Sequence, residues 1–70
     1  MAREALIHAV QPYDLHGVRY YAIRYAYANE PDALREARLA HDYIYPDPST
    51  GDQILVESLL NVVTEITKQE

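Results

Sequence analysis

The chain has no cysteine, tryptophan or phenylalanine, and only two glycines among its 70 residues. Without cysteine no disulfide can form, and zinc sites that need thiolate ligands are excluded. Phosphate-binding loops need clustered glycine before a helix, which is missing here. A domain of this size buries only about 60% of the surface its unfolded chain exposes. We therefore expect a single small domain, residues 1–70, that is supported by forming a homodimer.

The chain also lacks a long apolar run. The longest stretch without a charged residue is residues 5–13, whereas a membrane-spanning helix needs about 20 residues. The N-terminal sequence "MAREAL" has no basic segment followed by an apolar one, as a secretory signal would have. These absences predict a soluble, cytoplasmic protein that has no membrane partner.

Residue patterns typical of catalysis are missing too. The histidines His8, His16 and His41 lie far apart in sequence and form no HxxxH pair. The two serines have no glycine-elbow context. The segment "DPSTGD" resembles a calcium loop only superficially, because its glycine is at the fifth position and no glutamate follows at the twelfth. The sequence therefore predicts a protein that is not an enzyme and holds no metal or cofactor.

The formal net charge of −5 is unevenly distributed. Residues 1–28 carry three arginines against two acids, and residues 29–52 carry two arginines against six acids. An acidic chain is repelled by nucleic acid at long range. The middle of the chain is instead suited to a partner with a basic surface.

The segment "VRYYAIRYAYA", residues 18–28, alternates as a strand does. The face of this strand that is expected to point outward carries Tyr20 and Arg24. Residues 4–10 are expected to pair with it as a hairpin across a connection at residues 11–17, although their apolar spacing also suits a short helix. The face expected to point inward consists of Tyr21, Ile23, Tyr25 and Tyr27.

Two helices are expected to follow. Asn29 can cap a helix over residues 30–44, Pro31 suits its first turn and Pro46 stops it. Residues 45–52 contain two prolines and a glycine and predict a connection. In residues 52–68 most apolar positions fall within one half of a helical wheel, with Ile54 misplaced. The β-branched residues there also suit a strand, but the periodicity favours a helix.

The predicted fold class is therefore α+β, a small two-layer ββαα domain in which an N-terminal β-hairpin is followed by two helices. An all-α bundle of three to four short helices is the alternative. In the ββαα arrangement one strand edge stays open, and a dimer that continues the sheet closes it.

Candidate binding residues come from two surfaces. Tyrosine and arginine on the outer face of the second strand are enriched at binding hot spots. On the helix expected over residues 30–44, Leu39 and Tyr43 are four residues apart and are expected to stand in solvent among charged side chains. This arrangement resembles the centre of an interface with a polar rim. The predicted partner-binding residues are Tyr20, Arg24, Glu36, Leu39, Asp42, Tyr43 and Asp47.

These features predict a small acidic protein–protein interaction module, an adaptor or inhibitor that docks on a basic partner surface. Small phage-type inhibitors of nucleic-acid machinery belong to this class, but no motif places the chain among them. One alternative is a nucleic-acid-binding module that uses arginine and tyrosine of the second strand, which the acidic composition disfavours. Another is a small structural subunit of a larger assembly.

Overall fold

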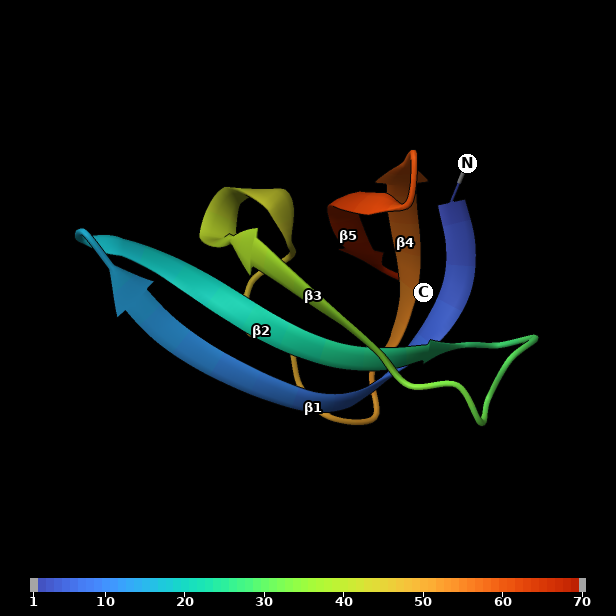
Figure 1. Cartoon of the computed structure of the whole chain (residues 1–70). Helices are drawn as coiled ribbons and strands as arrows, with labels where there is room; N and C mark the ends of the chain where they lie inside the picture. The colour runs from blue at the N-terminus through green and yellow to red at the C-terminus, as the bar shows by residue number, and fades with distance from the viewer. Residues whose placement is uncertain (1, 70) are drawn as a thin grey trace.

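The computed structural model describes residues 2–69 and contains five strands and one short 3₁₀ helix, η1. All five strands belong to a single antiparallel sheet with the order β3-β2-β1-β4-β5. β1 and β2 form a long curved ribbon, with the other strands on its concave side (Figure 1). The elements are β1 (Ala2–Leu15), β2 (Val18–Tyr27), β3 (Arg35–Ala40), η1 (His41–Tyr43), β4 (Gln53–Leu59) and β5 (Val62–Lys68).

β1 is central because it pairs with two different strands along its length. Its first residues pair with β4, whereas the run from Ala5 to Leu15 pairs with β2. A bulge between Ile7 and Ala9 shifts the register with β2, and such bulges bend and twist a strand. The bend lets one strand serve both halves of the sheet.

The two edges of the sheet approach each other. β3 and β5 are in contact, and a parallel bridge joins Ile44, just after η1, to Ile66 of β5. The sheet is thus rolled into a partly closed barrel. The open strand edge that we expected a dimer to cover is in part covered by the chain itself, and the homodimer stays a prediction.

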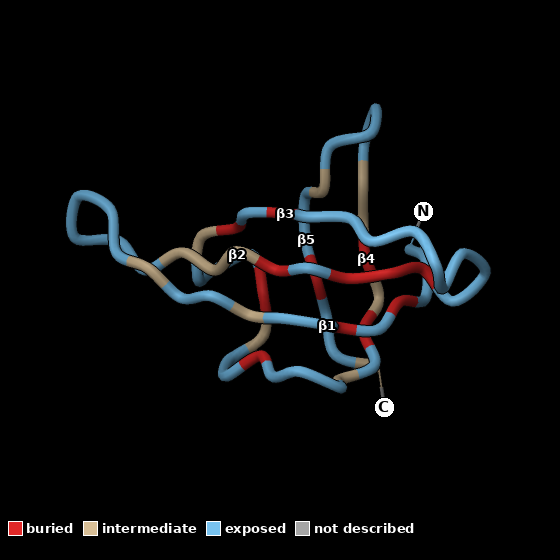
Figure 2. The backbone as a smooth tube through the Cα atoms, turned by 60° about the horizontal axis from the view of Figure 1, so that its bottom comes forward, coloured by how far each residue is buried: buried red, intermediate tan, exposed pale blue. Residues whose placement is uncertain are grey.

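The core fills the inside of this rolled sheet. Figure 2 shows the buried segments gathered where the strands cross, while the β1–β2 and β4–β5 turns are exposed. Five side chains are almost fully buried, and further alanine, tyrosine, leucine and isoleucine residues complete the cluster. The five are Ile7, Ile23, Ile54, Val56 and Ile66.

The predicted hairpin is confirmed, and it is longer than expected. β2 lies where the strand was predicted, and Ile23, Tyr25 and Tyr27 are buried on its inner face with Tyr21 packed against them. The connection shrinks to His16 and Gly17, both with positive φ. That geometry is a type I′ turn, which glycine adopts freely and histidine more readily than most residues.

The helix predicted over residues 30–44 is wrong. Residues 28–34 form a loop, residues 35–40 form β3, and only His41–Tyr43 are helical, as a single 3₁₀ turn. The sequence "REARLA" buries Ala37 and Leu39 and exposes Glu36 and Arg38. This period of two packs on β2, and tertiary contact overrides the local helix propensity.

The helix predicted over residues 52–68 is also wrong. The segment forms β4 and β5, joined by a turn at Leu60 and Asn61. Ile54, the misfit on the helical wheel, is fully buried. Neither the ββαα domain nor the all-α bundle is correct, because the described chain is an all-β sheet with one 3₁₀ turn.

The connection predicted over residues 45–52 is confirmed as a loop. It is held by the carboxylate of Asp52, which accepts hydrogen bonds from the Tyr45 hydroxyl at 2.7 Å and from the Ser49 N–H at 3.0 Å. The Tyr45 bond is the main cause that lowers the pKa of Asp52, and burial raises the pKa of Tyr45.

Within residues 2–69 no helix is long and apolar enough to cross a membrane.

Candidate functional site

The outer face of β1, β2 and β3 carries an unusual set of side chains. Strand pairing places Tyr13 opposite Tyr20, Gln11 opposite Ala22, and Ala22 opposite Arg38. Because neighbouring residues in a strand point to opposite sides, these residues face away from the core that holds Ile23 and Leu39. We call this surface the tyrosine–arginine face; it comprises Gln11, Tyr13, Tyr20, Ala22, Arg24, Glu36 and Arg38.

Tyr13 and Tyr20 form a stacked pair at the far end of this face. Their ring centroids are 5.6 Å apart and their planes differ by 16°. Both residues are half-buried. Beyond them Leu15 and Val18 are exposed beside the turn. The hairpin end therefore presents an aromatic and apolar surface that is partly exposed to solvent.

Two arginines on this face have no partner of their own. Across the described residues, the guanidinium groups of Arg24 and Arg38 make no hydrogen bond or ion pair, although Glu36 stands opposite Arg24 in the register. Together with Gln11 and Glu36 they line a groove of 330 Å³. Two unpaired guanidinium groups beside an aromatic pair can bind a planar, anionic ligand.

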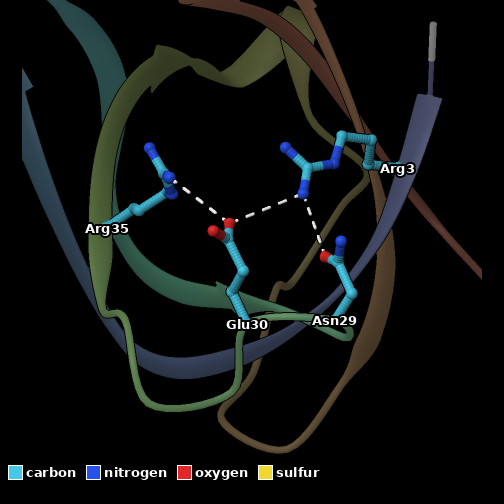
Figure 3. A network of polar contacts seen from close by, with 4 residues as sticks. All are labelled: Arg3, Asn29, Glu30 and Arg35. Carbon is cyan, nitrogen blue, oxygen red and sulfur yellow. Dashed lines mark hydrogen bonds and ion pairs between the residues drawn. The ribbon is translucent and has the colours of Figure 1, made fainter.

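The other arginines are engaged in the structure. Arg19 is bound to Asp14 at 2.6 Å, which lowers the pKa of that carboxyl. Arg3 and Arg35 both reach Glu30, at 3.5 and 3.4 Å (Figure 3). These three pairings leave Arg24 and Arg38 as the only arginines in residues 2–69 whose guanidinium groups have no hydrogen-bond or ion-pair partner.

The Glu30 network closes one end of the barrel. Arg3 donates to the Asn29 side chain at 2.9 Å, and its guanidinium lies 3.7 Å from the centre of the Tyr27 ring. Tyr27 meets Tyr25 edge-on, and burial is the main cause that raises the pKa of Tyr25 to about 12. These contacts stabilise the loop of residues 28–34 against β1 and β3.

The predicted partner-binding residues are only partly brought together. Tyr20, Arg24 and Glu36 share the tyrosine–arginine face. Leu39 is 5% exposed and belongs to the core, so the expectation that it stands in solvent is wrong. The predicted helix turns Leu39 toward solvent, but in β3 the alternation turns it inward.

The remaining predicted residues lie beyond the end of β3. Asp42 and Tyr43 are exposed in η1, directly after Ala40, which pairs with Tyr20. Asp47 lines a separate groove with Pro12, Arg19 and Tyr21 on the inner side of the hairpin. The acidic residues therefore do not form one continuous surface.

Sequence reasoning missed Gln11, Tyr13 and Arg38. The first two were assigned to a connection because of the neighbouring proline and aspartate, and Arg38 was assigned to a helix. The signal that could have found Arg38 is the alternation of apolar and charged residues in "REARLA". In the described part of the chain no group of three or more histidine or acidic side chains converges as a metal site would.

Comparison with protein-family models, curated proteins and solved structures finds no match for the chain.

Proposed function

We propose that the chain binds single-stranded nucleic acid on its tyrosine–arginine face. The observation that carries the proposal is that the only two unpaired arginines of the described residues, Arg24 and Arg38, share one sheet face with the stacked Tyr13–Tyr20 pair. Proteins that bind single strands combine aromatic side chains, on which bases stack, with cations that follow the phosphates. A sheet is a flat platform for such a ligand.

The type of fold supports the proposal by analogy. OB-fold domains are five-stranded, partly open Greek-key barrels that bind oligonucleotides on the face of strands 2 and 3. The strand order of this sheet and its closure between β3 and β5 resemble theirs. A fold carries no function by itself, and the residues of the face are the stronger support.

The net charge of −5 opposes long-range attraction of a polyanion. The proposed binding therefore depends on stacking and on two local phosphate contacts. This predicts modest affinity that is measurable at low salt, and a preference for single strands, whose bases are free to stack.

The test is a titration of labelled single-stranded and double-stranded oligonucleotides, followed by fluorescence anisotropy at low salt. We expect single strands to bind at roughly 1–100 µM, the range of weak electrostatic binding, and duplexes to bind more weakly. The double variant Arg24→Gln/Arg38→Gln should lose most of this binding. The matched control is Arg19→Gln, which removes an arginine that is paired with Asp14 on the other side of the hairpin. Absence of single-strand binding by the unmodified chain contradicts the proposal.

A second candidate function, docking on a protein, has its own observation. The β4–β5 turn exposes Leu59, Leu60 and Val62, at 67, 89 and 62%. These three residues, the hairpin tip, contribute nothing to the core. Leu60 has φ of 52°, a left-handed conformation that a branched side chain adopts at a cost. Apolar side chains held at a protruding turn suit an apolar pocket on a partner.

This partner would be a protein whose pocket has a basic rim, because the chain is acidic and Glu65 is exposed near the tip. A photo-crosslinking amino acid at position 60, with position 15 in the other exposed turn as control, tests the idea. We expect position 60 to crosslink to one protein that can be identified. That protein, once purified, should bind the chain again, and it should bind more weakly at high salt. The same set of proteins from both positions indicates nonspecific apolar contact and contradicts the proposal.

A further inference from the structure

A second groove continues the tyrosine–arginine face toward the other end of β1. It has a volume of 520 Å³, within the range of ligand sites. The strand register places Leu6 opposite Ala26, on the outer side of the sheet beyond Ala9 and Arg24. We call it the Glu4 groove; its lining includes Glu4, Leu6, His8, Ala26, Pro31, Gln53 and Gln69.

The groove has an apolar base and a polar rim. Leu6 and Ala26 come from β1 and β2, and Pro31 comes from the loop that follows β2. Glu4, His8 and Gln53 supply the polar groups, with His8 placed at the β1 bulge. Apolar side chains with a few polar groups around them suit a flat heteroaromatic ring.

Glu4 is held in position by the C-terminal segment. The Gln69 N–H donates to the Gln53 carbonyl at 2.9 Å, and the Gln69 side-chain amide donates to Glu4 Oε1 at 2.6 Å. Within residues 2–69 the second oxygen, Oε2, has no hydrogen-bond partner. The Glu4 backbone is also fixed, since its carbonyl accepts the Ala28 N–H at 2.9 Å. A carboxylate held in this way keeps Oε2 and a second lone pair of Oε1 as acceptors in a residue that lines the groove.

The charge of the lining decides which part of a nucleotide fits. No lysine or arginine lines the Glu4 groove, and its one charged lining residue is an acid, so a phosphate is repelled there. A carboxylate accepts from N–H groups, and guanine offers two adjacent donors, N1–H and N2–H, on an edge that is free in a single strand. Thymine and uracil offer one donor between two acceptors.

We infer that the Glu4 groove binds a guanine base of the same strand whose phosphates lie against Arg24 and Arg38. The inference rests on the proposed function and adds base preference at one position. Leu6 and Tyr13 are separated by seven positions of β1, roughly 20 Å at the rise of a strand. Several nucleotides span that distance, in keeping with the smaller single-strand site sizes.

The experiment compares three oligonucleotides on the full chain: oligo(dT), oligo(dT) with one dG, and the same strand with inosine in place of that dG. Inosine lacks the N2 amino group. We expect the dG strand to bind about tenfold more tightly than oligo(dT), the order of a bidentate base contact, with inosine between them. Glu4→Gln should remove the preference without weakening oligo(dT) binding, because it takes away the base contact together with a charge that repels phosphate. Glu36→Gln, which removes an acid from the tyrosine–arginine face, should tighten all three and keep the preference.

The outcomes separate the two proposals. If oligo(dT) binds but dG brings no preference, or if the preference survives in Glu4→Gln, the guanine site is wrong and the proposed function stands. If none of the three strands binds the unmodified chain, both are wrong. The inosine comparison needs no variant, so it tests the inference even if Glu4→Gln fails to fold.

Discussion

Tyr13 and Tyr20 stack across the β1–β2 ladder, 5.6 Å between ring centroids, near the exposed end of the hairpin. Cross-strand aromatic pairs contribute roughly 0.2–1 kcal/mol to a sheet. This pair is not part of the buried cluster that holds Ile7 and Ile23. Its rings can therefore serve a ligand without being essential to the core.

The first prediction separates stacking from apolar area at position 20. Tyr20→Phe keeps the ring and should bind single strands as the unmodified chain does. Tyr20→Leu keeps apolar area without a π-face and should lose about 1–3 kcal/mol of binding free energy, the value of one stacked base. Anisotropy titration measures both variants, and circular dichroism checks that they fold. Equal affinity of the leucine and phenylalanine variants contradicts a stacking role.

The second prediction concerns salt. Each phosphate neutralised on a single strand contributes about −0.7 to the slope of log K against log salt. Arg24 and Arg38 together therefore predict a slope of about −1.4. Arg24→Gln alone should halve it, and Arg19→Gln should leave it unchanged because that arginine is paired with Asp14. Titrations at four or five salt concentrations give the slope, and a value near zero contradicts phosphate contacts at these two residues.

The fold was predictable only where the spacing of apolar residues matched the period of a strand and not that of a helix, or the reverse. In β2 the alternation of Ile23, Tyr25 and Tyr27 with Arg24 has no helical counterpart, and the strand was found. In residues 52–68 the apolar positions match a helix and two strands alike. The turn that separates the strands, at Leu60 and Asn61, contains no glycine or proline to mark it.

The site was predictable in its centre and not at its borders. Tyr20 and Arg24 lie on the strand that the sequence identifies. Arg38 lies on a strand of six residues made of alanine, leucine, arginine and glutamate, which all favour helices. Their strand conformation comes from pairing with β2 and from burial of Ala37 and Leu39, and such long-range contacts are not visible in a local pattern.

The third prediction is that Leu60→Gly makes the protein more stable. Leu60 has φ of 52° and is 89% exposed, so its side chain carries a conformational cost and buries almost nothing. Glycine removes this conformational cost, which is roughly 1–2 kcal/mol. Part of the gain is offset because glycine gives the unfolded chain more conformational entropy. We expect the free energy of unfolding in urea to rise by about 0.5–1 kcal/mol.

Leu59→Gly is the matched control for that variant. It removes a similarly exposed leucine at the neighbouring position, which lies in β4. Glycine in a strand lowers stability by about 0.5–1 kcal/mol. The two substitutions should therefore change the unfolding free energy in opposite directions. A loss of stability in both means that Leu60 makes a packing contribution that its exposure does not reveal.

The last prediction is a pH dependence centred on the 45–52 loop. The hydrogen bond from Tyr45 and the Ser49 N–H lower the pKa of Asp52 below its ordinary value of 3.8. Because the folded-state pKa is lowered, the stabilisation is present above the unfolded pKa and is lost as the pH falls through the folded one. Asp52→Asn should therefore melt below the unmodified chain at pH 7, and the gap should narrow as the pH falls below the ordinary carboxyl pKa of 3.8. Asp47→Asn removes the same charge from the same loop without removing a hydrogen bond to that carboxylate, so it reports the effect of net charge alone. Thermal melts followed by circular dichroism measure all three proteins, and a gap that stays constant with pH would show that the Asp52 charge does not stabilise the loop.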